Sequence, residues 1–378
     1  MSTAPEAASL FAPARIGTLE LPNRLVMAPM SRNRAEADGT PTPLMADYYA
    51  QRAGAGLIIA EAAVPSQVGI TTANVPGAYT ESHVDGWRGV TEAVAAAGGR
   101  IFLQIEHGGR VSHRDNSGLD PIAPSPIALP EGIHTPSGHQ DSPVPREMTT
   151  AEVESTVEEF AAAARNAVRA GFAGVEVHAA NGYLLHQFLA DGTNRRTDEY
   201  GGSVENRLRF VLAVVRAVIA EVGADRVGIR ISPGSPVNGI SESDTPGQYR
   251  ALLEALAPLG IAYVHMVRAI PDRGLFSAIR RQWQGVLIAN PHLGGDRSIP
   301  ADGGLPQAAA LIEAGADLVS LGRSFLANPD LVERLRTGAA LNPVRSEGFE
   351  YVGGAEGYTD YPTLAESRNP VGSALRSR

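Results

Sequence analysis

Residues 178–207 gather an unusual number of polar side chains. The stretch reads HAANGYLLHQFLADGTNRRTDEYGGSVENR and opens with His178, Asn181, Tyr183, His186 and Gln187. A packed helix or strand would not select so many polar groups. The segment is therefore a candidate for chemistry rather than for the core.

A set of candidate site positions, many of them polar, stands where short apolar runs end. These positions are Pro29, Met30, Ser31, Glu61, Ala62, Gln104, Glu106, His107, His178, Asn181, Arg230, Gly322 and Arg323. A lone arginine there is more often a structural ion-pair partner, and a lone loop histidine more often faces solvent. Because several runs carry such groups at the same end, a shared site explains them better than separate accidents do.

The spacing of these residues favours some chemistries over others. We expect no metal site, because His178 and His186 lack an acidic third ligand and the neighbours Glu106 and His107 would point in opposite directions. No G-x-S-x-G elbow supports a serine hydrolase. A phosphate site is better supported by Gly303 and Gly304 in ADGGLPQ and by Gly322 and Arg323 in LGRS. The alternative, that the two glycines merely turn the chain, stays open.

Eight short apolar runs alternate with amphipathic ones and predict the elements that position these groups. The strands are expected at 25–28, 57–60, 101–105, 175–178, 227–231, 263–267, 286–289 and 318–321, and helices at 150–170, 205–222, 245–259, 305–314 and 330–336. Thr149 and Glu152 form a capping-box pattern before the first of these helices.

Eight such pairs predict one (β/α)₈ TIM barrel over residues 1–378. No G-x-G-x-x-G turn follows the first strand, which argues against a Rossmann domain. Residues 106–148 and 232–244 lack a sustained period and are predicted as long loops on the active face.

Composition limits the kinds of partner that the protein can have. The chain has a net charge of −9, no cysteine and 43% hydrophobic residues, and no apolar run is long enough to cross a membrane. We therefore expect no disulfide, no nucleic-acid surface and no membrane span. MSTAPEAASLFAPAR has no signal-peptide pattern, so a cytoplasmic monomer or homodimer acting on a small molecule is expected.

The motifs, taken in order, resemble the Old Yellow Enzyme family of FMN-dependent ene-reductases. The resemblance runs nearly end to end and rests on LPNRLVMAPMSRNRA (21–35), YYAQRAGAGLIIAEA (48–62), GGRIFLQIEHGGRVSH (98–113), AGFAGVEVHAANGYLLHQFL (170–189), NRRTDEYGGSVENRLRF (194–210), RVGIRISP (226–233), GADLVSLGRSFLANPDL (315–331) and GGAEGYTDYP (353–362).

The resemblance implies roles for individual residues. FMN would lie in the barrel mouth, reduced by NADPH or NADH, against Ala28, Pro29, Met30, Ser31, Ala62, Gln104 and Arg230, with its phosphate at Gly303, Gly304, Gly322 and Arg323. A fixed guanidinium near N1 and the C2 carbonyl would stabilise the reduced flavin. His178 and Asn181 would hold the carbonyl oxygen of an electron-poor alkene, and Tyr183 would donate the proton. His186, Gln187, Arg195, Arg196 and Asp198 are expected to be structural.

The chain departs from the family pattern around the substrate. Glu106 stands where many relatives have a tryptophan and Ile70 about where they have a tyrosine; Tyr351 is the third residue expected at the substrate pocket. Either a bulkier or more polar substrate faces Glu106, or Glu106 pairs with a nearby arginine. Residues 289–304 also form a longer segment than the usual turn after the seventh strand.

The leading interpretation is an NAD(P)H-dependent flavin oxidoreductase that reduces activated C=C bonds. Two alternatives remain at this stage. One is a phosphate-binding barrel lyase or isomerase without flavin, and the other is a flavoprotein whose altered pocket serves binding or regulation.

Overall fold

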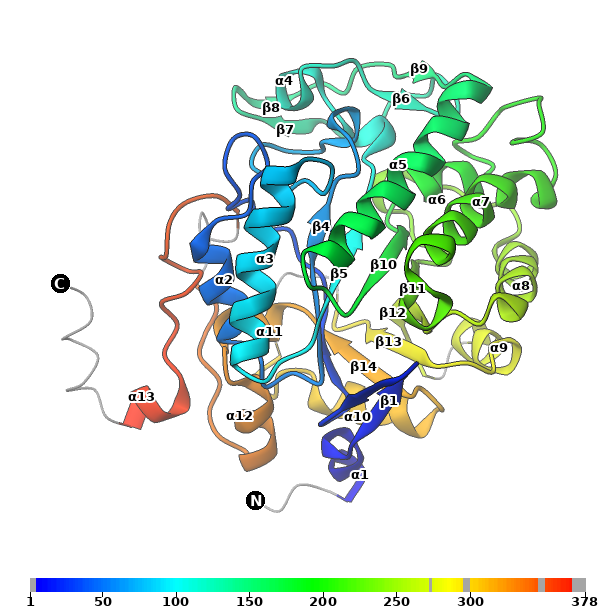
Figure 1. Cartoon of the computed structure of the whole chain (residues 1–378). Coiled ribbons are helices and arrows are strands. Elements are labelled where there is room, and N and C mark those ends of the chain that lie inside the picture. The colour runs from blue at the N-terminus through cyan, green and yellow to red at the C-terminus, as the bar shows by residue number, and fades with distance from the viewer. Residues whose placement is uncertain (1–4, 272–273, 295–299, 346–350, 369–378) are drawn as a thin grey trace.

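Eight parallel strands close into a barrel in the computed structural model, which describes residues 5–271, 274–294, 300–345 and 351–368 (Figure 1). The strands pair in the order β10-β11-β12-β13-β14-β3-β4-β5. Their bounds are β3 (Leu25–Met27), β4 (Leu57–Ala63), β5 (Ile101–Ile105), β10 (Gly174–Ala179), β11 (Val227–Ile231), β12 (Tyr263–Ala269), β13 (Leu287–Pro291) and β14 (Leu318–Leu321). All eight predicted strands are confirmed, with ends that shift by a few residues at most.

Nearly continuous burial explains why these runs form barrel strands. Every residue of β4, β5, β10 and β11 is buried, as expected for parallel strands covered on one side by helices and on the other by the barrel interior. Such strands need apolar residues on both faces. The polar residues among them, Gln104, Glu176 and Arg230, therefore call for an explanation.

Helices surround the barrel in Figure 1. Those of eight or more residues are α2 (Pro43–Ala50), α3 (Glu81–Ala96), α5 (Thr150–Arg169), α7 (Val204–Val222), α8 (Thr245–Leu256), α9 (Gly274–Gln282) and α10 (Leu305–Glu313). The shorter ones are α1 (Pro5–Ala8), α4 (Arg114–Ser117), α6 (Leu184–Leu189), α11 (Arg323–Ala327), α12 (Leu331–Thr337) and α13 (Leu364–Arg368). All five predicted helices are present, and the predicted capping box of Thr149 and Glu152 is confirmed at the start of α5.

The N-terminal end of the barrel is closed by a small hairpin. Strands β1 (Ala14–Ile16) and β2 (Leu19–Leu21) pair antiparallel and place Ile16 and Leu21 in a separate apolar cluster with the first residues of the barrel strands. Closure of this end leaves the opposite end, where the strands finish, as the open mouth.

The two predicted loops lie at that mouth. Residues 106–148 contain short elements that sequence periodicity does not reveal: α4, β6 (Ile122–Ala123), the hairpin of β7 (Ile133–Thr135) and β8 (Gly138–Gln140), and β9 (Arg146–Glu147). They form the cap at the top of Figure 1. Residues 232–244 hold a single 3₁₀ turn at Val237–Gly239.

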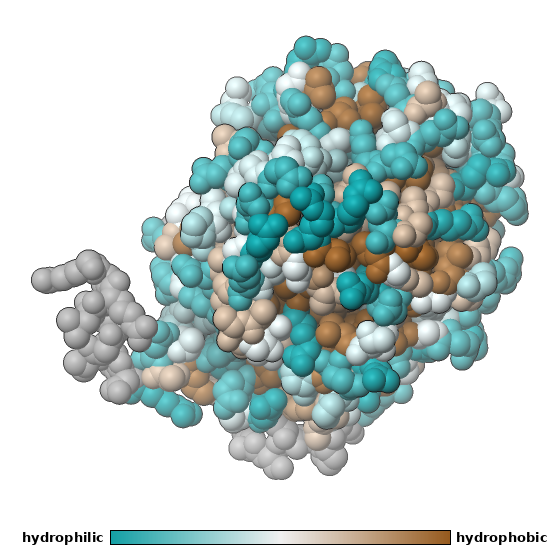
Figure 2. All heavy atoms as spheres, viewed as in Figure 1, coloured by the Kyte–Doolittle hydropathy of each residue, from teal (hydrophilic) through white to brown (hydrophobic). Residues whose placement is uncertain are grey.

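The outer surface alternates between polar and apolar residues on the face seen in Figure 2. Within the described ranges, no helix has the length and apolar character needed to cross a membrane.

Candidate active site

Two layers of inward-facing polar residues line the end of the barrel between β5 and β10. The register pairs Gln104 with Glu176 and Ile105 with Val177, so Glu106 and His178 follow side by side one step further toward the mouth. In the lower layer, Gln104 Nε2 donates to Glu176 Oε1 over 2.8 Å. In the upper layer, His178 Nε2 lies 3.3 Å from Glu106 Oε2. Because side chains two apart on a strand share a face, both layers face the barrel interior.

The lower layer continues across the barrel as a connected network. Glu176 Oε2 bonds to His265 Nδ1 over 2.8 Å, and His265 Nε2 bonds to Ser320 Oγ over 2.7 Å. Burial alone would raise the pKa of Glu176, but the charge of His265 and the hydrogen bonds lower it below the ordinary value. Gln104 is thereby anchored with its amide orientation fixed.

A strained turn after β10 presents Asn181. Asn181 and Gly182 both adopt positive φ, 53° and 78°, a conformation that asparagine and glycine tolerate best. Ser232 Oγ accepts from the Asn181 N–H over 2.7 Å, and Asn238 Nδ2 donates to the Asn181 carbonyl over 2.8 Å. A Cβ on Gly182 would lie 2.6 Å from that of Asn238. The Asn181 side-chain amide has no hydrogen bond to any described residue, so it is available to a ligand.

His186 supports the same turn from below, as predicted for a structural residue. Its Nδ1 accepts from the Gly182 N–H over 3.1 Å, which leaves Nε2 to donate to Glu242 Oε1, also 3.1 Å away. Glu242 further accepts from Gly234 N, Thr245 Oγ1, Gln248 Nε2 and Tyr249 Oη. This network joins the turn after β10 to the loop after β11.

Tyr183 immediately precedes α6 and packs beside His178, with ring centroids 5.1 Å apart. Its phenol has no hydrogen-bond partner among the described residues. The charge of Glu106, together with burial, raises the pKa of Tyr183 well above its ordinary value. Burial and the charge of Arg230 lower the pKa of His178, so its imidazole is neutral at physiological pH, and its Nδ1 is buried without a partner.

Arg230 is the clearest sign that something else occupies this mouth. It pairs with His178 in the strand register and is only 6% exposed. No described residue forms a hydrogen bond or ion pair with its guanidinium, and its Nε is a buried donor without an acceptor. The charges of Glu176 and Glu106 favour the charged form of Arg230, but a buried donor without an acceptor is still costly. The fold therefore keeps Arg230 for a ligand with an electron-rich edge.

The opposite wall comes from β3, β4 and β14. Ala28 and Ala62 are buried, and the β4–β5 register shifts between Ala60 and Ala63, a bulge of the kind found beside active sites. A Cβ on Gly322 would lie 3.2 Å from Met30 Sδ, so the end of β14 lies against the segment after β3. Glu61 is structural, because its carboxylate accepts from the Arg32 N–H and the Tyr49 hydroxyl.

The turn at Gly303 and Gly304 differs in one respect from the phosphate-binding turn that the sequence predicts. Gly303 and Gly304 were expected to offer free backbone N–H groups, but that of Gly303 donates to Pro300 O over 2.8 Å and that of Gly304 to Asp302 Oδ1 over 2.9 Å. The Asp302 carboxylate thus caps this turn itself, so the expectation of free donors there was wrong. Gly322 and Arg323 stand at the start of α11, a short helix that the sequence pattern does not predict.

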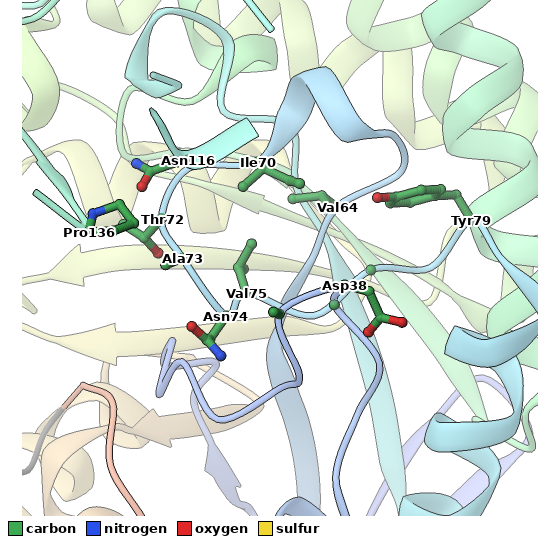
Figure 3. Close-up of a pocket in the computed structure, with 13 residues that line it drawn as sticks. Asp38, Val64, Ile70, Thr72, Ala73, Asn74, Val75, Tyr79, Asn116 and Pro136 are labelled. Carbon is green, nitrogen blue, oxygen red and sulfur yellow. The ribbon is translucent and has the colours of Figure 1, made fainter. Parts of the chain in front are cut away.

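Of the three residues expected at the substrate pocket, Glu106 and Tyr351 lie near Tyr183, and Ile70 lies apart from it. Glu106 lies beside His178 and forms no ion pair with an arginine within the described chain, although the charge of Arg230 lowers its pKa. Tyr351 is 51% exposed and close enough to Tyr183 to raise its pKa. Ile70 instead lines a lateral cavity of about 240 Å³ with Val64, Thr72, Asn74 and Tyr79 (Figure 3). That cavity includes none of His178, Asn181 and Tyr183.

Several supporting residues were not singled out from the sequence. They are Glu176, His265, Ser320, Ser232, Asn238 and Glu242. The signal for Glu176 was present, because it lies two residues before His178 on the same buried strand. Arg196 and Asp198 form the expected ion pair, whereas the Arg195 N–H bonds to Ser125 Oγ instead. In the parts of the chain that are described, no three acidic or histidine side chains converge as metal ligands.

This set of groups fits a flavin. An unpartnered buried guanidinium suits the electron-rich N1 and C2 edge of an isoalloxazine, and an anchored glutamine suits its polar rim. The small residues Ala28, Ala62 and Gly322 leave space for a flat ring. Fold and site together define a flavin-binding barrel oxidoreductase.

Comparison with known proteins identifies the family. The profile of the NADH:flavin oxidoreductase / NADH oxidase family matches residues 9–342. A Leishmania infantum protein named "Probable flavin mononucleotide-dependent alkene reductase" is 42% identical over 366 residues, covering 94% of this chain and 97% of its own. The 12-oxophytodienoate reductase 7 of Oryza sativa subsp. japonica is 39% identical and covers 96% of both chains.

Solved structures agree. Morphinone reductase in complex with tetrahydroNAD superimposes with a TM-score of 0.88 at 42% identity, over 96% of this chain and 99% of its own. An Old Yellow Enzyme homologue from Zymomonas mobilis gives 0.88 at 39% identity, over 94% and 100%. The chain belongs to the NADH:flavin oxidoreductase / NADH oxidase family, that of Old Yellow Enzyme. It is an FMN-dependent NAD(P)H oxidoreductase of the alkene-reductase type, and the alternative of a flavin-free lyase or isomerase is set aside.

Proposed function

We propose that His178, Asn181 and Tyr183 carry out the reduction of α,β-unsaturated carbonyl compounds in this protein. The observations that support the proposal are that the rings of His178 and Tyr183 pack side by side, that His178 Nδ1 is buried without a partner, and that no described residue forms a hydrogen bond with the Tyr183 hydroxyl or the Asn181 amide. Buried polar groups without partners are rare in proteins unless a ligand completes them.

Each residue has a distinct task. His178, held neutral by burial, and the amide of Asn181 donate hydrogen bonds to the carbonyl oxygen of the alkene. These bonds stabilise the negative charge that develops on that oxygen when the β-carbon accepts hydride. Tyr183 delivers a proton from its hydroxyl to the α-carbon. Its raised pKa keeps the phenol protonated at physiological pH, and the strongly basic α-carbon makes a weak acid sufficient.

Other residues hold the cofactor. When bound, FMN accepts hydride from NAD(P)H and supplies it to the alkene. Gln104 and Arg230 would contact its polar edge, Ala28 to Ser31 and Ala62 its ring, and Gly322 and Arg323 its phosphate. We further propose NADPH or NADH as the hydride donor and a cytoplasmic monomer or homodimer, built as one unit over residues 1–378.

Tyr183→Phe tests the assignment. We expect reoxidation of the reduced flavin by cyclohexenone to slow by about 100-fold or more, because the general acid is lost. Anaerobic bleaching of the flavin by NADPH should be nearly unchanged. Stopped-flow absorbance separates the two half-reactions.

The matched control is Tyr79→Phe, which removes a hydroxyl from the lateral cavity instead. It should leave both half-reactions intact. Equal losses in both half-reactions of Tyr183→Phe would contradict the proposed role.

A further inference from the structure

Glu106 differs from the other buried glutamates in what surrounds it. It is 3% exposed, yet its carboxyl group has no hydrogen bond from any described residue, and its Oε2 lies 3.3 Å from Nε2 of the neutral His178. In contrast, Glu61, Glu176 and Glu242 each accept at least two hydrogen bonds. A buried carboxyl group without donors is unfavourable for the fold alone. A ligand that bonds to it would remove this cost.

The groups that face Glu106 determine which ligand that is. His178 faces Glu106 from β10, and Arg230 faces it from β11. Tyr183 is close enough for the charge of an ionised Glu106 to raise its pKa, and Tyr351 lies near Tyr183. Burial raises the pKa of Glu106 to about 8, although Arg230 opposes the shift. At neutral pH the carboxyl group is therefore protonated and offers an O–H donor. A ligand acceptor, rather than a ligand cation, is its natural partner.

The register of the strands places this donor beside the oxygen-binding pair. Ile105 and Val177 are register partners, so the residues that follow them, Glu106 and His178, lie next to each other at the mouth of the barrel. An oxygen atom that accepts from His178 Nε2 then lies within reach of the Glu106 carboxyl group. A protonated carboxylic acid is a known donor to such oxygens in low-dielectric sites.

We propose that Glu106 is a third recognition group for the alkene, donating its carboxyl hydrogen to the activating oxygen that His178 and Asn181 hold. The inference rests on the proposed function of those two residues. It implies a preference for alkenes activated by a strong oxygen acceptor, such as a ketone or an aldehyde. It also implies that binding weakens when the carboxyl group ionises, because a carboxylate repels that oxygen.

Binding of cyclohexenone to the oxidised, FMN-loaded protein tests this without turnover. The flavin absorbance change would be titrated between about pH 6 and pH 10 for the wild type, Glu106→Gln and Glu106→Leu. Glutamine keeps a neutral donor at every pH, and leucine keeps apolar volume without a donor. Flavin content and the circular dichroism spectrum would verify that each variant is folded.

We expect wild-type affinity to fall about 10-fold as the pH rises through 8, the effect of one hydrogen bond on a buried oxygen. Glu106→Gln should bind with nearly constant affinity, and Glu106→Leu about 10-fold more weakly than the wild type at neutral pH. His178 and Tyr183 do not produce this change, because the pKa of the first is lowered and that of the second is raised out of this range.

Three results would overturn the proposal. They are a wild-type pH dependence that persists in Glu106→Gln, full affinity of Glu106→Leu at neutral pH, or tighter binding of an ammonium-bearing enone as the pH rises. The last would mean that the ionised carboxylate recognises a cation. If the wild type binds cyclohexenone with the expected profile but does not reduce it, the proposed function fails while the role of Glu106 stands.

Discussion

Two buried glutamate–histidine pairs, which share only the strand β10, have opposite surroundings. Glu176 bonds to both His265 and Gln104 at 2.8 Å, and its pKa is lowered despite burial. Glu106 lies one layer closer to the mouth beside His178, has no hydrogen-bond donor, and burial raises its pKa to about 8. The same residue types therefore exist in two electrostatic states a few ångströms apart along the barrel.

The difference separates scaffold from site. The hydrogen bonds of the lower pair are all made within the protein and fix Gln104. In the upper layer, hydrogen-bonding atoms of Glu106, His178 and, across the register, Arg230 have no partner in the described chain. Networks that are satisfied rigidify a core, while unsatisfied groups mark the surface that a ligand completes. The boundary between the two layers is the floor of the active site.

The largest expected difference between the two pairs is in the free energy of unfolding when each glutamate is replaced by leucine. Glu176→Leu leaves Gln104 and His265 without their shared partner, and we expect a loss of about 3–5 kcal/mol in the free energy of unfolding. Glu106→Leu removes a carboxyl group that the protein does not satisfy and should be neutral or stabilising. Urea unfolding of the FMN-loaded proteins at neutral pH measures both.

Equal destabilisation by the two leucine variants would show that the layers do not differ. Glu176→Gln is a useful intermediate, because an amide can still accept from Gln104 or bond to His265 but carries no charge. Its loss should be smaller than that of the leucine variant.

Arg230 offers a second test of the open layer. Arg230→Met should lower the midpoint potential of the bound flavin by about 30–60 mV, which corresponds to one charge-assisted hydrogen bond of about 1.5–3 kcal/mol in a two-electron couple. Anaerobic titration with a reference dye measures it. Arg230→Lys keeps the charge without the planar guanidinium, and its midpoint potential should lie between those of the wild type and Arg230→Met.

Arg52 is the matched control from the saturated part of the protein. Its buried guanidinium donates to the carbonyl oxygens of Phe325, Leu326 and Tyr48, each at 2.8 Å. Arg52→Met should lower stability while the potential stays unchanged. An unaltered potential in flavin-loaded Arg230→Met would contradict the contact that we assign to it.

Much of the barrel could be predicted because its cause is local. Each strand is a short β-branched run buried on both faces, and the pattern stops where the side chains turn polar, so strands such as β5 and β11 were found with their ends intact. The same break in the pattern located Gln104, His178 and Arg230 at one end of the barrel.

The partners of these residues could not be predicted, because they depend on register between strands far apart in sequence. Nothing near Glu106 in the chain indicates that it lies beside His178, and nothing near Glu176 indicates that it bonds to His265. The Gly303 and Gly304 turn shows a different limit. A glycine pair reveals a turn but not whether Pro300 and Asp302 already accept its N–H groups.

The smallest expected effect, taken per pH unit, is on the free energy of unfolding, and it reports directly on the two carboxyl groups. For Glu106, the native pKa of about 8 lies above its ordinary 4.5, so between these values the folded protein retains a proton that the unfolded chain has released. Wild-type stability should therefore decline across this window, by about 1 kcal/mol per pH unit relative to Glu106→Gln. Below and above the window, the stability curves of the two proteins should run parallel.

Glu176, whose pKa is lowered, contributes in the opposite sense: its stabilisation is present above its unfolded pKa and is lost as the pH falls through the native value. Unfolding of the wild type and Glu106→Gln over a series of pH values measures the slope. If the two curves stay parallel throughout, Glu106 is satisfied in the folded protein after all, and the distinction between the layers disappears.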